Sequence, residues 1–179
     1  MDFNERTFDN FNPDKPSAAR IYDYLLGGYH NFEVDRAAAR HIIALLPDMP
    51  LFMRANRAFL RRVVTYLADQ GIDQFLDIGS GIPTVGNVHE VAQKINPSAR
   101  IVYVDTEPVA VRHSKEILHD DPNATAIVAD ARQPELIRNH KEVRRLLDLD
   151  KPTAVLLLSI LLFITDDEEA YGVVRTLRD

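Results

Sequence analysis

Residues 75–83, with the sequence FLDIGSGIP, constrain the fold of this chain more than any other stretch. A short apolar run leads to Asp77, then to glycines at 79 and 81, and then to Pro83, which opens a helical pattern. This order is typical of a strand, a tight loop and the N-terminus of a helix. Glycines allow backbone angles closed to other residues and let a ligand approach the main chain. Because open α/β sheets bind ligands at the carboxyl ends of strands, the loop predicts a binding site.

The sequence after this loop alternates between strand-like and helix-like patterns. We expect strands at 74–78, 100–104, 125–129 and 154–162, with helices at 84–95, 108–118 and 134–147 between them and a last helix capped by Thr165 or Asp166. Strands that alternate with helices predict a parallel sheet with right-handed crossovers. The predicted fold class is therefore α/β, a doubly wound, Rossmann-like and mostly parallel sheet.

Three helices are expected before the first strand. The first is capped by Ser17 and ends at Gly27 and Gly28, and the others span 34–46 and 51–69. The apolar side of the third is expected to consist of Phe52, Ala55, Phe59, Val63 and Leu67. The predicted organisation is a flexible arm at 1–16, a helical lid or support segment at 17–71, and a Rossmann-like core at 72–179.

The last predicted strand, 154–162, is apolar on both faces, as in a central strand that helices cover on both sides. If the strands are ordered 3-2-1-4, it lies instead at an open edge, where a long apolar strand invites pairing. We expect one of two explanations. Either the chain is truncated after this strand relative to a longer protein, which we favour, or a second copy covers the edge in a homodimer.

Composition excludes several functional classes. The net charge of −6 argues against a general nucleic-acid-binding protein, and the absence of cysteine excludes disulfides, thiolate metal sites and a cysteine nucleophile. The six histidines show no metal-ligand spacing, so we expect no metal. The first 14 residues lack the layout of a signal peptide, and the longest apolar run, 154–164, is too short to span a bilayer. We expect a soluble, cytoplasmic protein without a membrane partner.

Aspartates end three of the predicted strands. Asp77 lies two residues before the first glycine of the loop, where a carboxylate would repel a pyrophosphate and favour a ligand with positive charge. S-adenosylmethionine carries such charge on its ammonium and sulfonium groups. Asp105, after the second strand, is placed to accept hydrogen bonds from ribose hydroxyls, and Asp130, after the third, from an adenine amino group.

Each of these residues also has a purely structural interpretation. The glycine loop is a possible turn without a ligand, and Asp105 and Asp130 are possible caps of the helices that begin near Pro108 and Pro134. The hydroxyl of Ser159 is a possible hydrogen-bonding group within its strand. The arginines on the third helix (Arg54, Arg57, Arg61 and Arg62) are typical of a solvated face rather than a substrate clamp.

Several stretches together resemble a known family. The loop at 75–83 with Asp105 and Asp130 is similar to class I S-adenosylmethionine-dependent methyltransferases. More narrowly, the chain resembles an actinobacterial group of these methyltransferases long classed as a domain of unknown function. The matching stretches are ARIYDYLLGG at 19–28 with Asn31 and Phe32, RANRAFLRR at 54–62, GNVHEVA at 86–92 and VYVD at 102–105.

The resemblance implies a class I methyltransferase fold that binds S-adenosylmethionine. The implied cofactor-binding residues are Asp77, Gly79, Ser80, Gly81, Asp105, Thr106, Asp130, Ala131 and Ser159. Asp77 and the glycines would contact the methionine part, Asp105 the ribose and Asp130 the adenine. We further expect a lid that includes Tyr22, Asp23, Tyr24 and Asn31, although such an aromatic stripe also suits simple packing.

The leading hypothesis is therefore methyl transfer from S-adenosylmethionine to a small-molecule acceptor, with catalytic residues unassigned. The alternative from another class is a domain that binds the nucleoside without turnover. A nicotinamide oxidoreductase is a third hypothesis, which Asp77 and the threonine at the position of the third fingerprint glycine, Thr84, disfavour.

Overall fold

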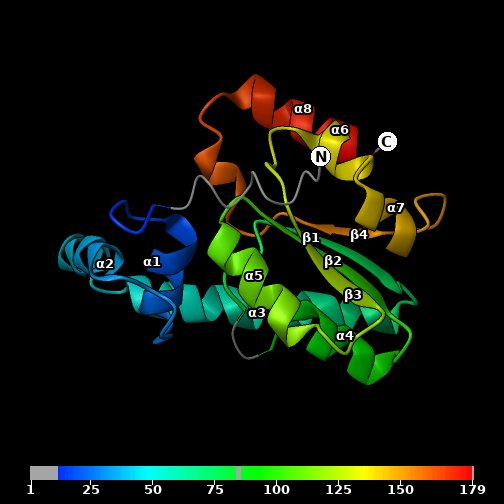
Figure 1. Cartoon of the computed structure of the whole chain (residues 1–179), viewed down its shortest axis with the longest axis horizontal. Coiled ribbons are helices and arrows are strands. Elements are labelled where there is room, and N and C mark those ends of the chain that lie inside the picture. Colours follow the sequence, from blue (N-terminus) through cyan, green and yellow to red (C-terminus); the bar gives the residue numbers. More distant parts are fainter. Residues whose placement is uncertain (1–11, 84–85, 179) are drawn as a thin grey trace.

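The structure is a computed structural model that describes residues 12–83 and 86–178, where four parallel strands form one sheet (Figure 1). The strands are β1 (Gln74–Ile78), β2 (Arg100–Asp105), β3 (Ala124–Val128) and β4 (Ala154–Leu156), in the order β3-β2-β1-β4. Adjacent strands pair in parallel, with Asp77 opposite Tyr103 on β2 and Leu156 on β4. The predicted α/β fold class is confirmed.

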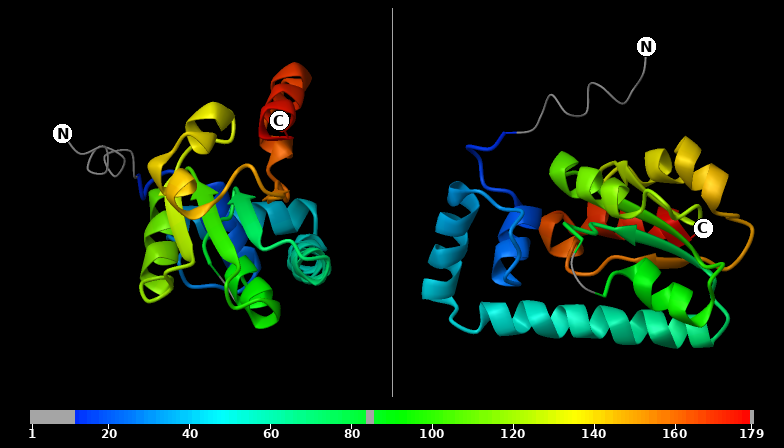
Figure 2. Two further views of the ribbon diagram at one scale, coloured as in Figure 1. Left: turned by 90° about the vertical axis from the view of Figure 1, so that its right-hand side faces the viewer. Right: turned by 60° about the horizontal axis from the view of Figure 1, so that its bottom comes forward.

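Helices surround this sheet and precede it. They are α1 (Ala18–Leu25), α2 (Glu33–Leu45), α3 (Met49–Asp69), α4 (Val88–Ile95), α5 (Pro108–Ile117), α6 (Pro134–Arg138), α7 (Lys141–Leu146), α8 (Asp167–Arg178) and the 3₁₀ turn η1 (Leu161–Phe163). Figure 2 shows α3 (cyan) running along one face of the sheet, with α1 and α2 (blue) beyond one end of it. Of the arm predicted at 1–16, residues 1–11 lie outside the part of the chain that the structure describes.

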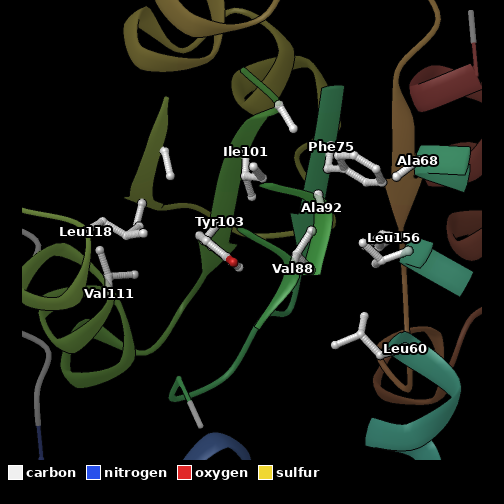
Figure 3. Close-up of a cluster of buried hydrophobic side chains, with 14 residues drawn as sticks. Leu60, Ala68, Phe75, Val88, Ala92, Ile101, Tyr103, Val111, Leu118 and Leu156 are labelled. Carbon is white, nitrogen blue, oxygen red and sulfur yellow. The ribbon is translucent and has the colours of Figure 1, made fainter. Parts of the chain in front are cut away.

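The alternation of side chains along each strand builds two core layers. Phe75, Ile101 and Tyr103 point into one layer, where α3, α4 and α5 cover them, and Figure 3 shows this cluster. Leu76 and Val102 point the other way, into a layer formed with α6, α7 and α8. Asp77 lies two residues after Phe75, so its side chain is on the same face of the sheet. It therefore projects toward the layer of α3 and α4, at the carboxyl end of β1.

The fourth strand is much shorter than the prediction of 154–162. Regular strand structure ends at Leu156, and the chain then turns through Ser159, whose φ of 58° is left-handed, into η1. The apolar composition predicted burial but not backbone conformation, because Ile160 packs on the sheet from a turn while Leu162 and Phe163 are exposed. β4 does lie at the edge of the sheet; that a second copy covers it stays a prediction.

The predicted apolar side of α3 is wrong for Phe52, Ala55 and Phe59, which are exposed, whereas Val63 and Leu67 are partly buried and pack against the core. The helix buries Met53, Leu60, Val64 and Ala68, whereas the exposed fractions of Phe52 and Phe59 are 63% and 47%. Apolar residues occur at adjacent positions along this helix, so the helical period alone does not decide which stripe faces the sheet.

Two further local predictions differ from the structure. The helix expected at 134–147 is divided into α6 and α7, because His140 accepts a hydrogen bond from the Glu142 N–H and caps a new helix. Ser17 precedes α1 but does not cap it with its side chain; its N–H donates instead to Asp35. The predicted cap at Asp166 is confirmed, since this carboxylate accepts from the Glu169 N–H.

A buried ion network ties the N-terminal helices to the sheet. Arg20 of α1 is 1% exposed and lies 2.8 Å from the Asp35 carboxylate of α2 and 3.0 Å from the Glu107 carboxylate after β2. Asp35 also accepts the N–H groups of Ser17 and Phe32. Burial acts to raise the pKa of Asp35, but hydrogen bonds from Arg20 and these N–H groups outweigh it and hold the pKa below its usual value.

We predict that Arg20→Met lowers the free energy of unfolding by about 3–5 kcal/mol, because two carboxylates would stay in the interior without their cation. The matched control is Arg40→Met, which removes an exposed arginine that pairs with Glu33 and should leave stability nearly unchanged. Urea unfolding followed by circular dichroism measures both. Equal effects of the two substitutions would contradict a structural role for the buried network.

Candidate functional site

One cavity of about 630 Å³ lies at the carboxyl ends of β1, β2 and β3. Its walls come from the loops after these strands, the start of α1, the middle of α3, and the turn between β4 and η1. Figure 2 shows α1 (blue) and η1 (orange) at the same end of the sheet. This volume lies within the range of small-molecule binding sites.

All of the predicted cofactor-binding residues line this cavity, including Ser80, Thr106, Ala131 and Ser159. The fold therefore brings together residues from four separate loops. Of the predicted lid residues, Tyr22 lines the cavity. Asp23 and Asn31 lie outside the lining and hold the turn after α1, since Asp23 accepts from the His30 N–H and from the Asn31 amide. Tyr24 packs in the small core around Leu25. The lid motion stays a prediction.

The glycine loop has the conformation that its sequence indicates. Gly79 and Gly81 have φ values of 73° and 68°, and the N–H groups of Gly79 and Ser80 both donate to the Val104 carbonyl of β2. A Cβ at Gly79 would lie 2.7 Å from the Ile160 side chain, whereas one at Gly81 would meet nothing within 4 Å. Gly79 is therefore needed for close packing against the turn after β4, and Gly81 leaves open space.

Asp77 is a buried carboxyl group that receives no hydrogen bond from any described residue. Burial raises its pKa from 3.8 to about 7, Arg57 opposes this shift, and the nearby Asp105 adds to it. This environment favours the neutral form of the carboxyl group far more than an exposed position would. Carboxyl groups with such raised pKa values concentrate at functional sites.

Asp105 has a structural role as well as a place in the cavity wall. One of its oxygens accepts the Gly81 N–H at 2.7 Å and the other accepts the Glu107 N–H at 2.8 Å. Burial raises the pKa of Asp105, and these backbone hydrogen bonds only partly offset that effect. The carboxylate thus clamps the glycine loop to the segment after β2. Each carboxylate oxygen has two lone pairs, so further acceptor capacity remains.

Asp130 is more exposed than the other two aspartates. Its carboxylate pairs with Arg132, whose hydrogen bond is the main reason that the pKa of Asp130 is lowered. It does not act as the side-chain cap of α6, whose N-cap is Gln133. At the rim of the cavity both of its oxygens accept hydrogen bonds from the guanidinium group of Arg132, and one also accepts from the Arg132 backbone N–H.

The sequence did not identify several polar residues of the cavity wall, among them Arg20, Asn56, Arg57 and Glu107. The interpretation of Arg57 as part of a solvated face is wrong, because this side chain lines the cavity. Its Nε and the Glu107 Oε1 are buried polar atoms without a hydrogen-bond partner among the described residues. Glu107 lies two residues after Asp105, and this position in the sequence could have indicated that it lines the cavity. The direction of the Arg57 side chain depends on how α3 packs against the sheet, which no local sequence pattern reveals.

Within the described ranges, no cluster of potential metal ligands was found. None of the described helices combines the length and apolar character that a membrane span requires.

The chain resembles known proteins over nearly all of its length. The family model described as S-adenosyl methyltransferase matches residues 4–179. A crystal structure of a proposed methyltransferase from Thermobifida fusca YX shares 43% identity at a TM-score of 0.88, covering 99% of this chain and 66% of that one. A DUF574 family protein from Streptomyces avermitilis MA-4680 shares 40% identity at a TM-score of 0.88, covering 93% and 65%. The chain thus spans just under two thirds of each of these proteins. No curated protein matches it.

The raised pKa of Asp77 predicts a pH-dependent stability. The unfolded chain ionises this carboxyl near pH 4 and the folded chain only near pH 7, so the folded state loses stability as the pH rises between these values. We expect the free energy of unfolding of the wild type, relative to Asp77→Asn, to fall by about 2 kcal/mol between pH 5 and pH 8.

Urea unfolding at several pH values measures this difference. Asp120→Asn, at a fully exposed position, controls for the general effect of removing one charge. A wild-type minus Asp77→Asn difference that stays constant from pH 5 to pH 8 would show that Asp77 does not titrate as its burial implies.

Proposed function

The chain belongs to the S-adenosyl methyltransferase family, and from this premise we propose that its cavity binds S-adenosylmethionine and that it transfers the methyl group to a small-molecule acceptor. The observation that carries the proposal is the placement of Asp77, Asp105 and Asp130, from the ends of three adjacent strands, around one cavity. We further propose residues 17–71 as the support and lid of a binding core at 72–179, and a cytoplasmic location.

The described residues fit this cofactor. Two buried acidic groups, Asp77 and Asp105, suit a ligand that carries positive charge, and the space above Gly81 allows close approach to the backbone. The unpartnered Glu107 Oε1 needs a donor, which a ribose hydroxyl would supply. We therefore propose that Glu107 shares the ribose with Asp105. Asp130 is proposed to accept from the adenine amino group.

When bound, the cofactor supplies a methyl group made electrophilic by the positively charged sulfur. The contribution of the chain is to align the acceptor with that group and to exclude water. The remaining cavity wall includes Tyr22, Asn56 and apolar side chains such as Leu60 and Phe163. This mixed surface suits a small, partly apolar acceptor. The geometry identifies no general base.

Calorimetric titration with S-adenosylhomocysteine tests the binding step. We expect the wild type to bind, and Asp105→Ala to weaken binding by about 1–3 kcal/mol, since it removes an acceptor and releases the glycine loop. Asp120→Ala, at an exposed position, is the matched control and should bind as the wild type does. Circular dichroism of each variant verifies folding.

An absence of heat with S-adenosylhomocysteine would contradict the proposed cofactor. An unchanged affinity of Asp105→Ala would remove this residue from the ribose site. Methyl transfer to members of a small-molecule acceptor panel, followed by release of S-adenosylhomocysteine, tests the catalytic step. Tight binding without turnover across the panel would favour a domain that only holds the nucleoside.

A further inference from the structure

Ser159 has two features that the packing of the fold does not account for. Among the residues that the structure describes, it is the one residue other than glycine with a left-handed backbone, at a φ of 58°. This conformation is unfavourable for a residue with a side chain, and residues strained in this way cluster at ligand-binding sites. Ser159 also lines the cavity, and none of the described residues forms a hydrogen bond with its hydroxyl group. The hydroxyl group is therefore free to bind a ligand.

The turn that carries Ser159 lies against the glycine loop. The next residue, Ile160, packs so closely on Gly79 that a Cβ there would lie 2.7 Å from the Ile160 side chain. Because β4 ends at Leu156 and the chain turns at Ser159, this segment reaches the carboxyl end of the sheet. The strained turn therefore holds the serine beside the loop that we propose to bind the cofactor.

The cavity wall contributed by this turn is apolar, and aromatic side chains form part of it. Leu158 and Phe163 lie on either side of Ser159 in the sequence, and Phe163 is 59% exposed although it lines the cavity. Tyr22 lines the same cavity from α1; its hydroxyl group accepts from the Asn56 amide and is therefore already engaged. Phe163 and Tyr22 thus offer aromatic surface, and a charged acceptor bound against this wall would lose its hydration without gaining a partner.

The charged groups of the cavity wall belong to its other parts. Its carboxylates come from the ends of β1, β2 and β3 and from the residues just after them, and Arg57 donates to Asn87 at the start of α4. No histidine of the described chain lines the cavity. A hydroxyl acceptor beside Ser159 therefore has no general base on that side and must release its proton readily. A phenol, with a pKa of about 10, does so far more readily than an aliphatic alcohol.

We propose that Ser159 contacts the methyl acceptor rather than the cofactor, and that this acceptor is an uncharged phenol whose hydroxyl group hydrogen-bonds to the Ser159 hydroxyl. The inference rests on the proposed function, because it concerns the second ligand of the same cavity. In the transfer, the phenolic oxygen gains the methyl group through a new carbon–oxygen bond. The carbon–sulfur bond breaks and leaves its electron pair on sulfur, and the phenolic proton passes to water.

Three probes that share one carbon skeleton test the acceptor class. They are 2-naphthol, the charged 2-naphthoate, and decahydro-2-naphthol, whose hydroxyl group is aliphatic. In equilibrium dialysis with saturating S-adenosylhomocysteine, we expect 2-naphthol to bind at least about tenfold more tightly than 2-naphthoate and about threefold more tightly than decahydro-2-naphthol. If either of the other probes bound as tightly as 2-naphthol, the proposed acceptor class would be wrong.

Substitution of Ser159 tests the contact itself. Ser159→Gly should weaken binding of 2-naphthol by about 5- to 20-fold and change that of S-adenosylhomocysteine by less than about twofold. It should not lower the midpoint of thermal unfolding, because glycine adopts the left-handed conformation without strain. Ser159→Ala removes the hydroxyl group but keeps the Cβ, and it should lose 2-naphthol affinity to a similar extent. Ser98→Ala, at an exposed position outside the cavity, is the matched control and should bind both ligands as the wild type does.

The outcomes separate this inference from the proposed function. If the wild type does not bind S-adenosylhomocysteine, the proposed function fails, and this inference fails with it. If the wild type binds S-adenosylhomocysteine but not 2-naphthol, or if both Ser159 variants keep full affinity for 2-naphthol, only this inference is overturned. Equal losses for the two ligands would place Ser159 in the cofactor site or give it a purely structural role, and either result overturns the acceptor contact.

Discussion

The burial of Asp77 at the end of β1 is the constraint on which the rest of the site depends. A carboxyl group that no described donor hydrogen-bonds is held in the interior, and its pKa is raised to about 7 as a result. A core residue selected for stability alone would not be acidic at this position. The sheet, the glycine loop and α3 create this environment together. The chain therefore keeps a buried carboxyl group, without a hydrogen-bond donor among the described residues, in the wall of the cavity.

The second constraint is the connection between the N-terminal helices and this site. Glu107 uses one oxygen to pair with Arg20 and leaves the other buried at the cavity wall. The Arg20 side chain is in turn held by its ion pair with Asp35 of α2. The position of α1, which supplies Tyr22 to the cavity, is thus fixed through the same segment that carries Asp105. Residues of α1 and α3 therefore line the cavity, and α2 supports α1 through Asp35.

The sequence was informative where structure is determined locally. The strand, glycine loop and aspartate pattern at 75–83 and the strand ends at Asp105 and Asp130 predicted both the sheet and the cavity residues, because backbone periodicity and strand polarity fix them. The sequence did not predict the features that depend on how the elements pack against one another. The stripe of α3 that faces the sheet, the turn at Ser159 after β4 and the inward direction of Arg57 all depend on contacts between distant segments.

The features that the sequence did not predict all arise from contacts between distant segments, and the same contacts shape the cavity. Because β4 ends at Leu156, the following turn brings Ile160 against Gly79 and places Phe163 in the cavity wall; a longer strand would have carried both past the site. Because α3 turns Leu60 toward the sheet, Arg57, one helical turn earlier, reaches the cavity as well. The same tertiary contacts that local patterns do not predict therefore close the site on two sides, while the strand ends supply its acidic groups.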